Sequence, residues 1–329
     1  MRLLLALLIS AAGTLPGPQS LPSSFDVKVR CESHVQGVAI DTAARCFYLS
    51  FTTSLLKTDY EGNVLARIDS INGHLGALTF DGRSRKLYAS LECKDDAVGQ
   101  GIAKKLGRQA FTQEESKFYI AVVDVDRMEE SAMERYEVDD ACRDYGARYG
   151  CSGIDGVTIA PRIGRRNGRP RLYVAYGIYG DPARNDNDNQ VLLEYKLSRL
   201  KRGVKAPKRS AKYFIFTGNT NWGVQNLCYD APTGCIYMAT YGSSKPEFGG
   251  FNLFAVPVRQ KPVRKAPEGL DEKQECLETT ARKWNFKDAS TGVCSLGDGT
   301  WLVATPLKLP GGGQTATIRR VPCPGTDGK

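Results

Sequence analysis

The stretches HVQGVAIDTAARCFYLSFT (residues 34–52) and HLGALTFDGRSRKLYASLE (residues 74–92) are two copies of one pattern. Each copy contains an alternating apolar strand, a turn, and a second strand in which an aromatic residue precedes an apolar residue and Ala or Ser. Related copies follow at 154–177, 223–242 and 290–306. The small or polar residues at the shared pivot position are Gly37, Gly76, Gly156, Asn226 and Gly292. Self-similarity of this kind indicates a repeat fold.

A third strand follows each of these pairs, as in SLLKTDY and QVLLEYKL, and a fourth strand follows most of them, as in GNVLARI. The strands are short, rich in Val, Ile, Tyr and Phe, and separated by turn residues. Four antiparallel strands repeated around an axis predict an all-β fold, a β-propeller. We expect five blades, with FDVKVR (25–30) adding a strand to the last blade and closing the ring.

Two alternatives to this architecture stay open at the level of the sequence. Six blades would be possible because residues 257–287 do not follow the repeat. A β-sandwich with long loops would account for the strands. It would not explain why the same short pattern recurs before each second strand.

The chain begins MRLLLALLISAAGTLPGPQS, with one positive charge, a short apolar run and a Gly/Pro/Ser tail. This is the layout of a secretory signal, and the run is too short to span a membrane. We therefore predict a signal peptide at 1–20, a single propeller domain at 21–329, and a secreted or periplasmic location. The alternative is a buried N-terminal helix. No later run is long enough for a membrane span, and we expect a monomer.

The chain has ten cysteines. In an exported protein this number predicts disulfides, and Cys142–Cys151 and Cys228–Cys235 are the pairs closest in sequence. A zinc site is not expected, because the chain has no CxxC motif and only two histidines.

The formal charge of +9 favours an anionic partner, and its distribution is uneven. Three basic segments, 161–171, 196–209 and 259–265, are predicted to lie on one face of neighbouring blades. They are either solvated loops that keep edge strands from pairing or a docking patch for an acidic polymer. Nucleic acid is not expected, because no aromatic residues are interleaved with these cations.

The opposite face is predicted to hold the functional site. In an antiparallel blade, the loop that enters strand one and the loop between strands two and three open on the same face, here called the entry face. Convergent polar groups in a concavity are the usual sign of a binding site. The candidate ligand-binding residues on this face are Gln36, Tyr179, Asn219, Trp222, Gln225, Asn226, Tyr241 and Lys245.

Both histidines of the chain, His34 and His74, fall on the entry face. A His near a Tyr or an Asp can transfer protons close to neutral pH, so His34, His74, Tyr176 and Asp155 are the candidate catalytic residues. The alternative is that each His is a hydrogen-bonded structural residue. No nucleophile motif is present.

The stretch YGIYGDPARNDNDNQ (176–190) offers oxygen ligands of the kind that Ca²⁺ prefers, with Asp181, Asp186 and Asp188 as candidate metal ligands. Its spacing does not match an EF-hand, and Asx-rich loops are also ordinary turns. A cation held in the channel by Asp155, Asn219, Gln225 or Asn226 is a second possibility.

The motifs GHLG, SGIDG, YGIYGD, DND, GNT and GVQN resemble a group of exported bacterial propeller proteins without an assigned activity. This resemblance implies the propeller and its channel-mouth residues. A looser analogy connects the fold with calcium-dependent propellers of the gluconolactonase and senescence-marker type. We expect a hydrolase acting on an anionic small molecule or glycan, with Ca²⁺ as a possible cofactor. The alternatives are a non-catalytic carbohydrate- or protein-binding propeller and a polysaccharide lyase.

Overall fold

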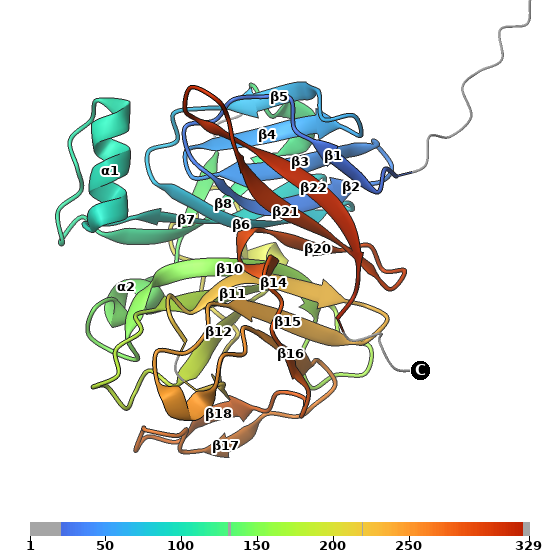
Figure 1. Cartoon of the computed structure of the whole chain (residues 1–329). Helices are drawn as coiled ribbons and strands as arrows, with labels where there is room; N and C mark the ends of the chain where they lie inside the picture. Colours follow the sequence, from blue (N-terminus) through green and yellow to red (C-terminus); the bar gives the residue numbers. More distant parts are fainter. Residues whose placement is uncertain (1–20, 131–132, 219, 325–329) are drawn as a thin grey trace, which may run out of the picture.

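The computed structural model describes residues 21–130, 133–218 and 220–324. The predicted signal peptide at 1–20 and the candidate residue Asn219 lie outside these residues. Five sheets are arranged as a ring, so the prediction of a five-bladed β-propeller is confirmed (Figure 1). Within the described residues no helix is long and apolar enough to cross a membrane.

Each blade is built on four strands in the order predicted by the repeat, and the sheet of the third blade has two further strands. The first blade consists of β2 (Val35–Asp41), β3 (Cys46–Phe51), β4 (Ser54–Asp59) and β5 (Val64–Ile68), and the second of β6 (His74–Asp81), β7 (Lys86–Cys93), β8 (Lys117–Asp124) and β9 (Glu134–Glu137). The third contains β10 (Cys151–Pro161), β11 (Pro170–Ile178), β12 (Asn189–Tyr195) and β13 (Ala211–Phe216). The fourth contains β14 (Val224–Asp230), β15 (Cys235–Thr240), β16 (Leu253–Pro257) and β19 (Lys283–Trp284).

The fifth blade joins the two ends of the chain. It contains β20 (Val293–Ser295), β21 (Thr300–Lys308) and β22 (Gln314–Pro322), and its outer strand is β1 (Ser24–Asp26), which pairs antiparallel with β22. The closing strand predicted within residues 25–30 is therefore confirmed. Because the N-terminal strand completes the last blade, the ring has no gap between its first and last blades.

The segment that did not follow the repeat forms an extra hairpin. Strands β17 (Val263–Lys265) and β18 (Gln274–Leu277) leave the fourth blade and extend the third, where β18 runs parallel to β13 (Figure 1). The chain then returns to the fourth blade through β19. The part of this segment between β16 and β19 is thus an insertion between strands three and four of the fourth blade, and no sixth blade is needed.

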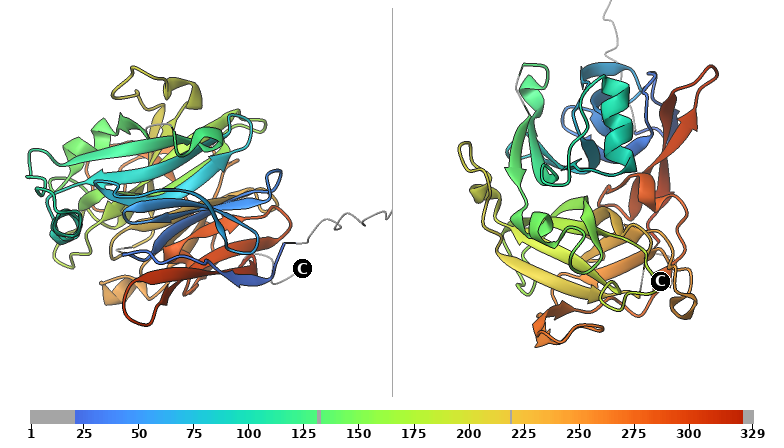
Figure 2. Two further views of the ribbon diagram at one scale, coloured as in Figure 1. Left: turned by 90° about the horizontal axis from the view of Figure 1, so that it is seen from above. Right: turned by 90° about the vertical axis from the view of Figure 1, so that its left-hand side faces the viewer.

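The part of the chain that the structure describes contains two α-helices, α1 (Ala97–Leu106) and α2 (Asp139–Asp144). Helix α1 lies in the connection between β7 and β8, on the face toward the viewer in the right panel of Figure 2. Asp96 caps its first turn and Gly107 ends it in the left-handed conformation. Short 3-10 turns occur at Val125–Arg127, Leu197–Arg199, Pro246–Phe248 and Ala289–Thr291.

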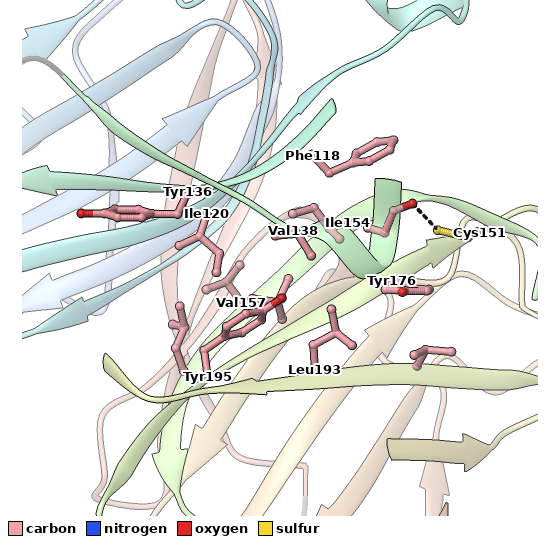
Figure 3. Close-up of a cluster of buried hydrophobic side chains, with 14 of the residues drawn as sticks. Phe118, Ile120, Tyr136, Val138, Cys151, Ile154, Val157, Tyr176, Leu193 and Tyr195 are labelled. Carbon is pink, nitrogen blue, oxygen red and sulfur yellow. Dashed lines mark hydrogen bonds between the residues drawn. The ribbon is translucent and has the colours of Figure 1, made fainter. Parts of the chain in front are cut away.

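The apolar side chains form five core clusters, one between each pair of neighbouring blades. Figure 3 shows the cluster between the second and third blades, where Phe118, Ile154 and Tyr176 are among the buried side chains. Alternating apolar residues in every strand supply these layers, because successive side chains point to opposite faces of a sheet. The interfaces between blades therefore hold the ring together.

Close contacts between first strands occur at the pivot residues. A Cβ atom added at Gly37 would lie 2.9 Å from the backbone nitrogen of Leu78, and one added at Gly156 would lie 2.9 Å from Leu227 Cγ. Strand one is irregular at this level in the first four blades. Such bulges re-aim side chains and are frequent next to functional sites. The pivots thus allow close packing at the entry end of the channel.

The predicted disulfides are not formed: each of the ten cysteines is a thiol. Cys228 lies opposite Tyr237 and Cys235 opposite Asp230, so the two cysteines are diagonal neighbours. Diagonal neighbours on paired strands are about 7–8 Å apart, with their Cβ atoms somewhat closer, whereas a disulfide requires Cβ atoms about 3.5–4.5 Å apart. The two cysteines of the other predicted disulfide have different surroundings. The Cys142 thiol lies among charges that include Glu137 and Lys117, while Cys151 Sγ lies 3.9 Å from the carbonyl oxygen of Ala141.

Candidate functional site

The first element of the site is a cross-strand pair in the second blade. His74 begins β6, and the register of the hairpin places it opposite Glu92 in β7. His74 Nδ1 donates to Glu92 Oε2 over 3.2 Å. This bond fixes the ring and directs Nε2 away from the carboxylate. Burial disfavours the imidazolium, but the bond to Glu92 and the charges of Asp155 and Glu92 outweigh it and raise the pKa of His74.

Glu92 is a buried anchor rather than a group open to a ligand, since its side chain is 1% exposed. Its Oε1 accepts the backbone N–H of Ile154 at 2.9 Å, and its Oε2 lies 2.7 Å from Lys94 Nζ. Burial alone would raise its pKa, but the charges of Lys94 and His74 lower it. Glu92 is therefore an ionised group that holds its neighbours in place.

Lys94 supplies a buried positive charge beneath the site. Its Nζ donates to the carbonyl oxygen of Ser152 at 2.9 Å and lies 3.4 Å from Asp96 Oδ2. Burial opposes its charge, but Glu92, Asp155 and Asp96 outweigh this effect and raise its pKa. The ammonium group thus neutralises the carboxylates that surround it.

Asp155 belongs to the third blade and faces the histidine of the second. Its Oδ1 lies 4.0 Å from His74 Nδ1, and its Oδ2 accepts a hydrogen bond from Gln225 Nε2 at 3.2 Å. Burial and the nearby charge of Glu92 raise the pKa of Asp155 to about 7, although His74, Lys94 and Gln225 act in the opposite direction. Asp155 is thus a carboxyl group that exchanges its proton near neutral pH.

The second histidine lies in a different environment. His34 precedes β2, and its Nε2 accepts a hydrogen bond from Gln36 Nε2 at 2.9 Å. The surface of its ring remains exposed. Desolvation by the surrounding protein and the positive charges of His74 and Lys105 lower the pKa of His34. At the same pH, a smaller fraction of His34 than of His74 is therefore protonated.

Two other predicted ligand-binding groups are used within the ring itself. Asn226 is buried and donates to the carbonyl oxygens of Gln36 and Ser290, at 3.3 and 3.0 Å. Gln36 is also buried and donates to Thr52 Oγ1 at 3.4 Å. These bonds join the first, fourth and fifth blades across the axis.

Tyr176 does not lie at the mouth of the channel. Strand β11 continues to Ile178, so Tyr176 lies in a strand rather than in a loop, and its side chain is buried in the core between blades. Its hydroxyl donates to Asp144 Oδ2 at 2.8 Å. The prediction that Tyr176 stands beside a histidine at the entry face has no support in this geometry.

Aromatic side chains form an exposed rim beside Asp155. Trp222 is 55% exposed and Tyr241 is 40% exposed. The ring of Tyr179 packs edge-on against Trp222 at 6.1 Å. Gln225 donates to both the backbone oxygen of Trp222 and the carboxylate of Asp155, which connects the rim to the buried cluster.

The Asx-rich loop of the third blade does not gather its carboxylates. Asp181 accepts the backbone N–H of Ala183, and Asp186 pairs with Arg184. Asp188 is 2.7 Å from the buried ammonium of Lys245, which ties this loop to 241–250. Each carboxylate has a different protein partner, so the loop presents no shared set of calcium ligands. The metal hypothesis for this loop stays a prediction.

His74, Glu92 and Asp155 are the described residues whose donor atoms come close enough to hold a metal ion, within 4.8 Å of one another. The set does not fit calcium, which takes six to eight oxygen ligands. Lys94 also occupies the Glu92 oxygen that would bind the ion. The arrangement fits proton transfer better than metal binding.

Glu92 is not among the site residues predicted from the sequence. It lies next to the end of β7, the second strand of its blade, at the position that Thr52 holds in the first copy of the repeat. The sequence did contain a signal for Glu92: it is a charged residue in a strand that is otherwise mostly apolar, eighteen positions after a His. Neither known protein-family models nor curated protein sequences gave a match to the chain.

Proposed function

We propose that the channel mouth is the active site of an exported hydrolase that acts on a glycan or an anionic sugar derivative. One observation carries this proposal. Asp155, a nearly buried carboxyl group with a pKa raised to about 7, lies 4.0 Å from His74 Nδ1 at the mouth of the propeller. Strongly perturbed ionisable groups that converge in a binding region are typical of catalytic sites.

The two groups have complementary roles in hydrolysis. The ideal catalytic acid or base has a pKa near the working pH, and Asp155 meets this condition. His74, whose pKa is raised, donates the proton of its Nε2 to the oxygen of the leaving group, while the carboxylate of Asp155 accepts the proton of the attacking water. Glu92 holds Nδ1 of His74, so it is a positioning residue, and Lys94 keeps Glu92 ionised.

The substrate class follows from the rim. Exposed aromatic rings give a flat apolar surface with a polar edge, which suits the face of a sugar ring. Trp222 provides such a surface next to Gln225 and Asp155. The positive charge at His74 favours an acidic substituent on that sugar. Export is part of the proposal, because the substrate would be met outside the cytoplasm.

A second candidate function is non-catalytic carbohydrate binding, and the same rim favours it. Trp222 has a positive φ of 61°. That conformation is costly for a bulky residue. Trp222→Gly should therefore leave the free energy of unfolding unchanged or raise it by up to about 1 kcal/mol, while weakening any glycan affinity. A lectin-like protein would show this loss and no turnover.

Turnover assays of the mature protein separate the two functions. The panel consists of 4-methylumbelliferyl glycosides and glucuronides, a sugar lactone and polygalacturonate, each assayed with Ca²⁺ and with EDTA. We expect hydrolysis of at least one substrate with a pH dependence near the Asp155 pKa. Asp155→Asn and His74→Gln should lower kcat about 10²-fold or more, as expected for a lost acid or base. Asp298→Asn, on an exposed turn, is the matched control.

The same assays identify the outcomes that oppose the proposal. Binding without turnover of any substrate would favour the carbohydrate-binding function. An unsaturated sugar product would indicate a lyase. Activity abolished by EDTA and restored by Ca²⁺ would mean that a metal, and not the His74–Asp155 pair alone, drives the reaction.

A further inference from the structure

The face opposite the active site carries a basic hollow. The three basic segments, 161–171, 196–209 and 259–265, contain sixteen Lys and Arg and no Asp or Glu. Subtracting these sixteen charges from the formal +9 of the whole chain leaves −7 for the remainder. The positive charge of this protein is therefore concentrated in about a tenth of its length.

The fold brings parts of all three segments to one cavity of about 750 Å³. The cavity lies where the β17–β18 hairpin extends the third blade, close to the hairpin between β10 and β11 and the start of β13. Gly164 N donates to the carbonyl oxygen of Val258 at 2.9 Å, which holds the first segment against the residue that precedes the third. The cations that line the cavity are Arg162, Arg165, Arg209, Lys212, Lys261 and Arg264.

Some of these cations already have carboxylate partners. Arg209 and Lys212 pair with Asp140 and Asp144 of α2. Arg264 lies 3.9 Å from Glu275. These charges therefore contribute little to the attraction of a further anion.

The remaining cations give the cavity its net charge. Arg162 and Arg171 share the single carboxylate of Glu194, at 4.0 and 3.3 Å. Arg165 and Lys261 are exposed, and among the residues that the structure describes neither has an ion-pair partner. The cavity thus keeps a surplus of about three positive charges, counting one from the Arg162–Arg171 pair.

We infer that this cavity binds a segment of an acidic glycan, one that carries carboxylate or sulfate groups. Its volume lies within the range of sites that hold small ligands, so a few sugar units fit. Guanidinium groups match the geometry of carboxylate and sulfate oxygens. A nucleic-acid duplex presents its phosphates on a convex surface that cannot enter a hollow. Stacking of single-stranded bases is not favoured either, because Tyr213, the aromatic residue among those that line the cavity, is buried and its hydroxyl donates to Glu194. This inference does not depend on the proposed hydrolase activity.

The test measures binding of the mature protein to dextran sulfate and polygalacturonate at several salt concentrations. Neutral dextran, inorganic sulfate and a DNA duplex are the comparison ligands. The double variant Arg165→Gln/Lys261→Gln should weaken acidic-glycan binding about tenfold or more, because two charge-assisted contacts are lost. Arg108→Gln/Lys308→Gln removes the same charge at exposed positions outside the cavity and should change binding less than twofold.

Several results would overturn the inference. Equal weakening in both double variants would mean that binding follows total charge rather than the cavity. Inorganic sulfate binding as tightly as the polymer, tighter binding of the duplex, or no binding of either acidic glycan would each contradict an acidic-glycan site. Both double variants should keep the unfolding midpoint of the parent protein, because all four side chains are exposed.

Discussion

The first and second blades begin with nearly the same sequence, yet their histidines differ in chemistry. His34 and His74 occupy the same place in the repeat, and eighteen residues later the first copy has Thr52 where the second has Glu92. In the first blade the histidine accepts from an amide and its pKa is lowered. In the second the carboxylate binds Nδ1 and the pKa is raised. One side chain in the second strand therefore decides whether the mouth of a blade is inert or suited to proton transfer.

The largest expected effect follows from removing the charge that distinguishes the two blades. Glu92→Gln keeps the shape of the side chain but leaves the Lys94 ammonium buried without its closest carboxylate. Breaking a buried ion pair on one side costs about 3–5 kcal/mol, so urea unfolding should show a loss of that size. Thr52→Val at the equivalent position should cost less than about 1.5 kcal/mol. Equal losses would mean that the two blades do not differ in this way.

A smaller effect should appear in the pH dependence of stability. The pKa of Asp155 is raised in the folded state to about 7 from an ordinary value of 3.8. The folded protein then holds a proton that the unfolded chain releases, so stability falls as the pH rises between about 4 and 7. The limiting slope for one such group is about 1.4 kcal/mol per pH unit. Asp155→Asn should remove this part of the slope in urea unfolding at pH 5, 6 and 7, and an unchanged slope would contradict the assignment.

The fold was readable from the sequence, and the site only in part. The alternation of apolar residues and the sequence repeat predicted the five blades and the closing strand. Both of these patterns can be read from short stretches of sequence. The register shift in strand one aims Asp155 at His74, and this depends on packing between blades. The same limit explains Tyr176, whose place in β11 turned a predicted mouth residue into a core residue.

The cysteines show a second limit of sequence reasoning. Number and spacing favoured disulfides, but the strand register holds Cys228 and Cys235 diagonally apart. Burial instead raises the pKa of several thiols, to about 11 for Cys31, Cys93 and Cys294. The melting temperature should therefore be the same, within about 2 °C, with and without a reducing agent. A drop of many degrees on reduction would show that disulfides contribute to stability.

The smallest change would carry the chemistry of the second blade into the first. Thr52→Glu puts a carboxylate near His34, and an opposite charge within about 4–6 Å raises a histidine pKa by about one unit or more. Thr52→Gln is the matched control, because it has the same size without the charge. A rise in the His34 pKa with Glu and not with Gln, followed by NMR, would support the role given to Glu92. Similar values in both variants would contradict it.

The most direct test of the account is an NMR titration of the two histidines in the parent protein. The chain contains only two, so the single variants His34→Gln and His74→Gln assign both signals. We expect His74 to titrate above the ordinary pKa of about 6.5 and His34 below it, and Asp155→Asn to lower the value of His74. Equal values, or the reverse order, would contradict the claim that Glu92 and Asp155 make the mouth of the second blade an acid–base site.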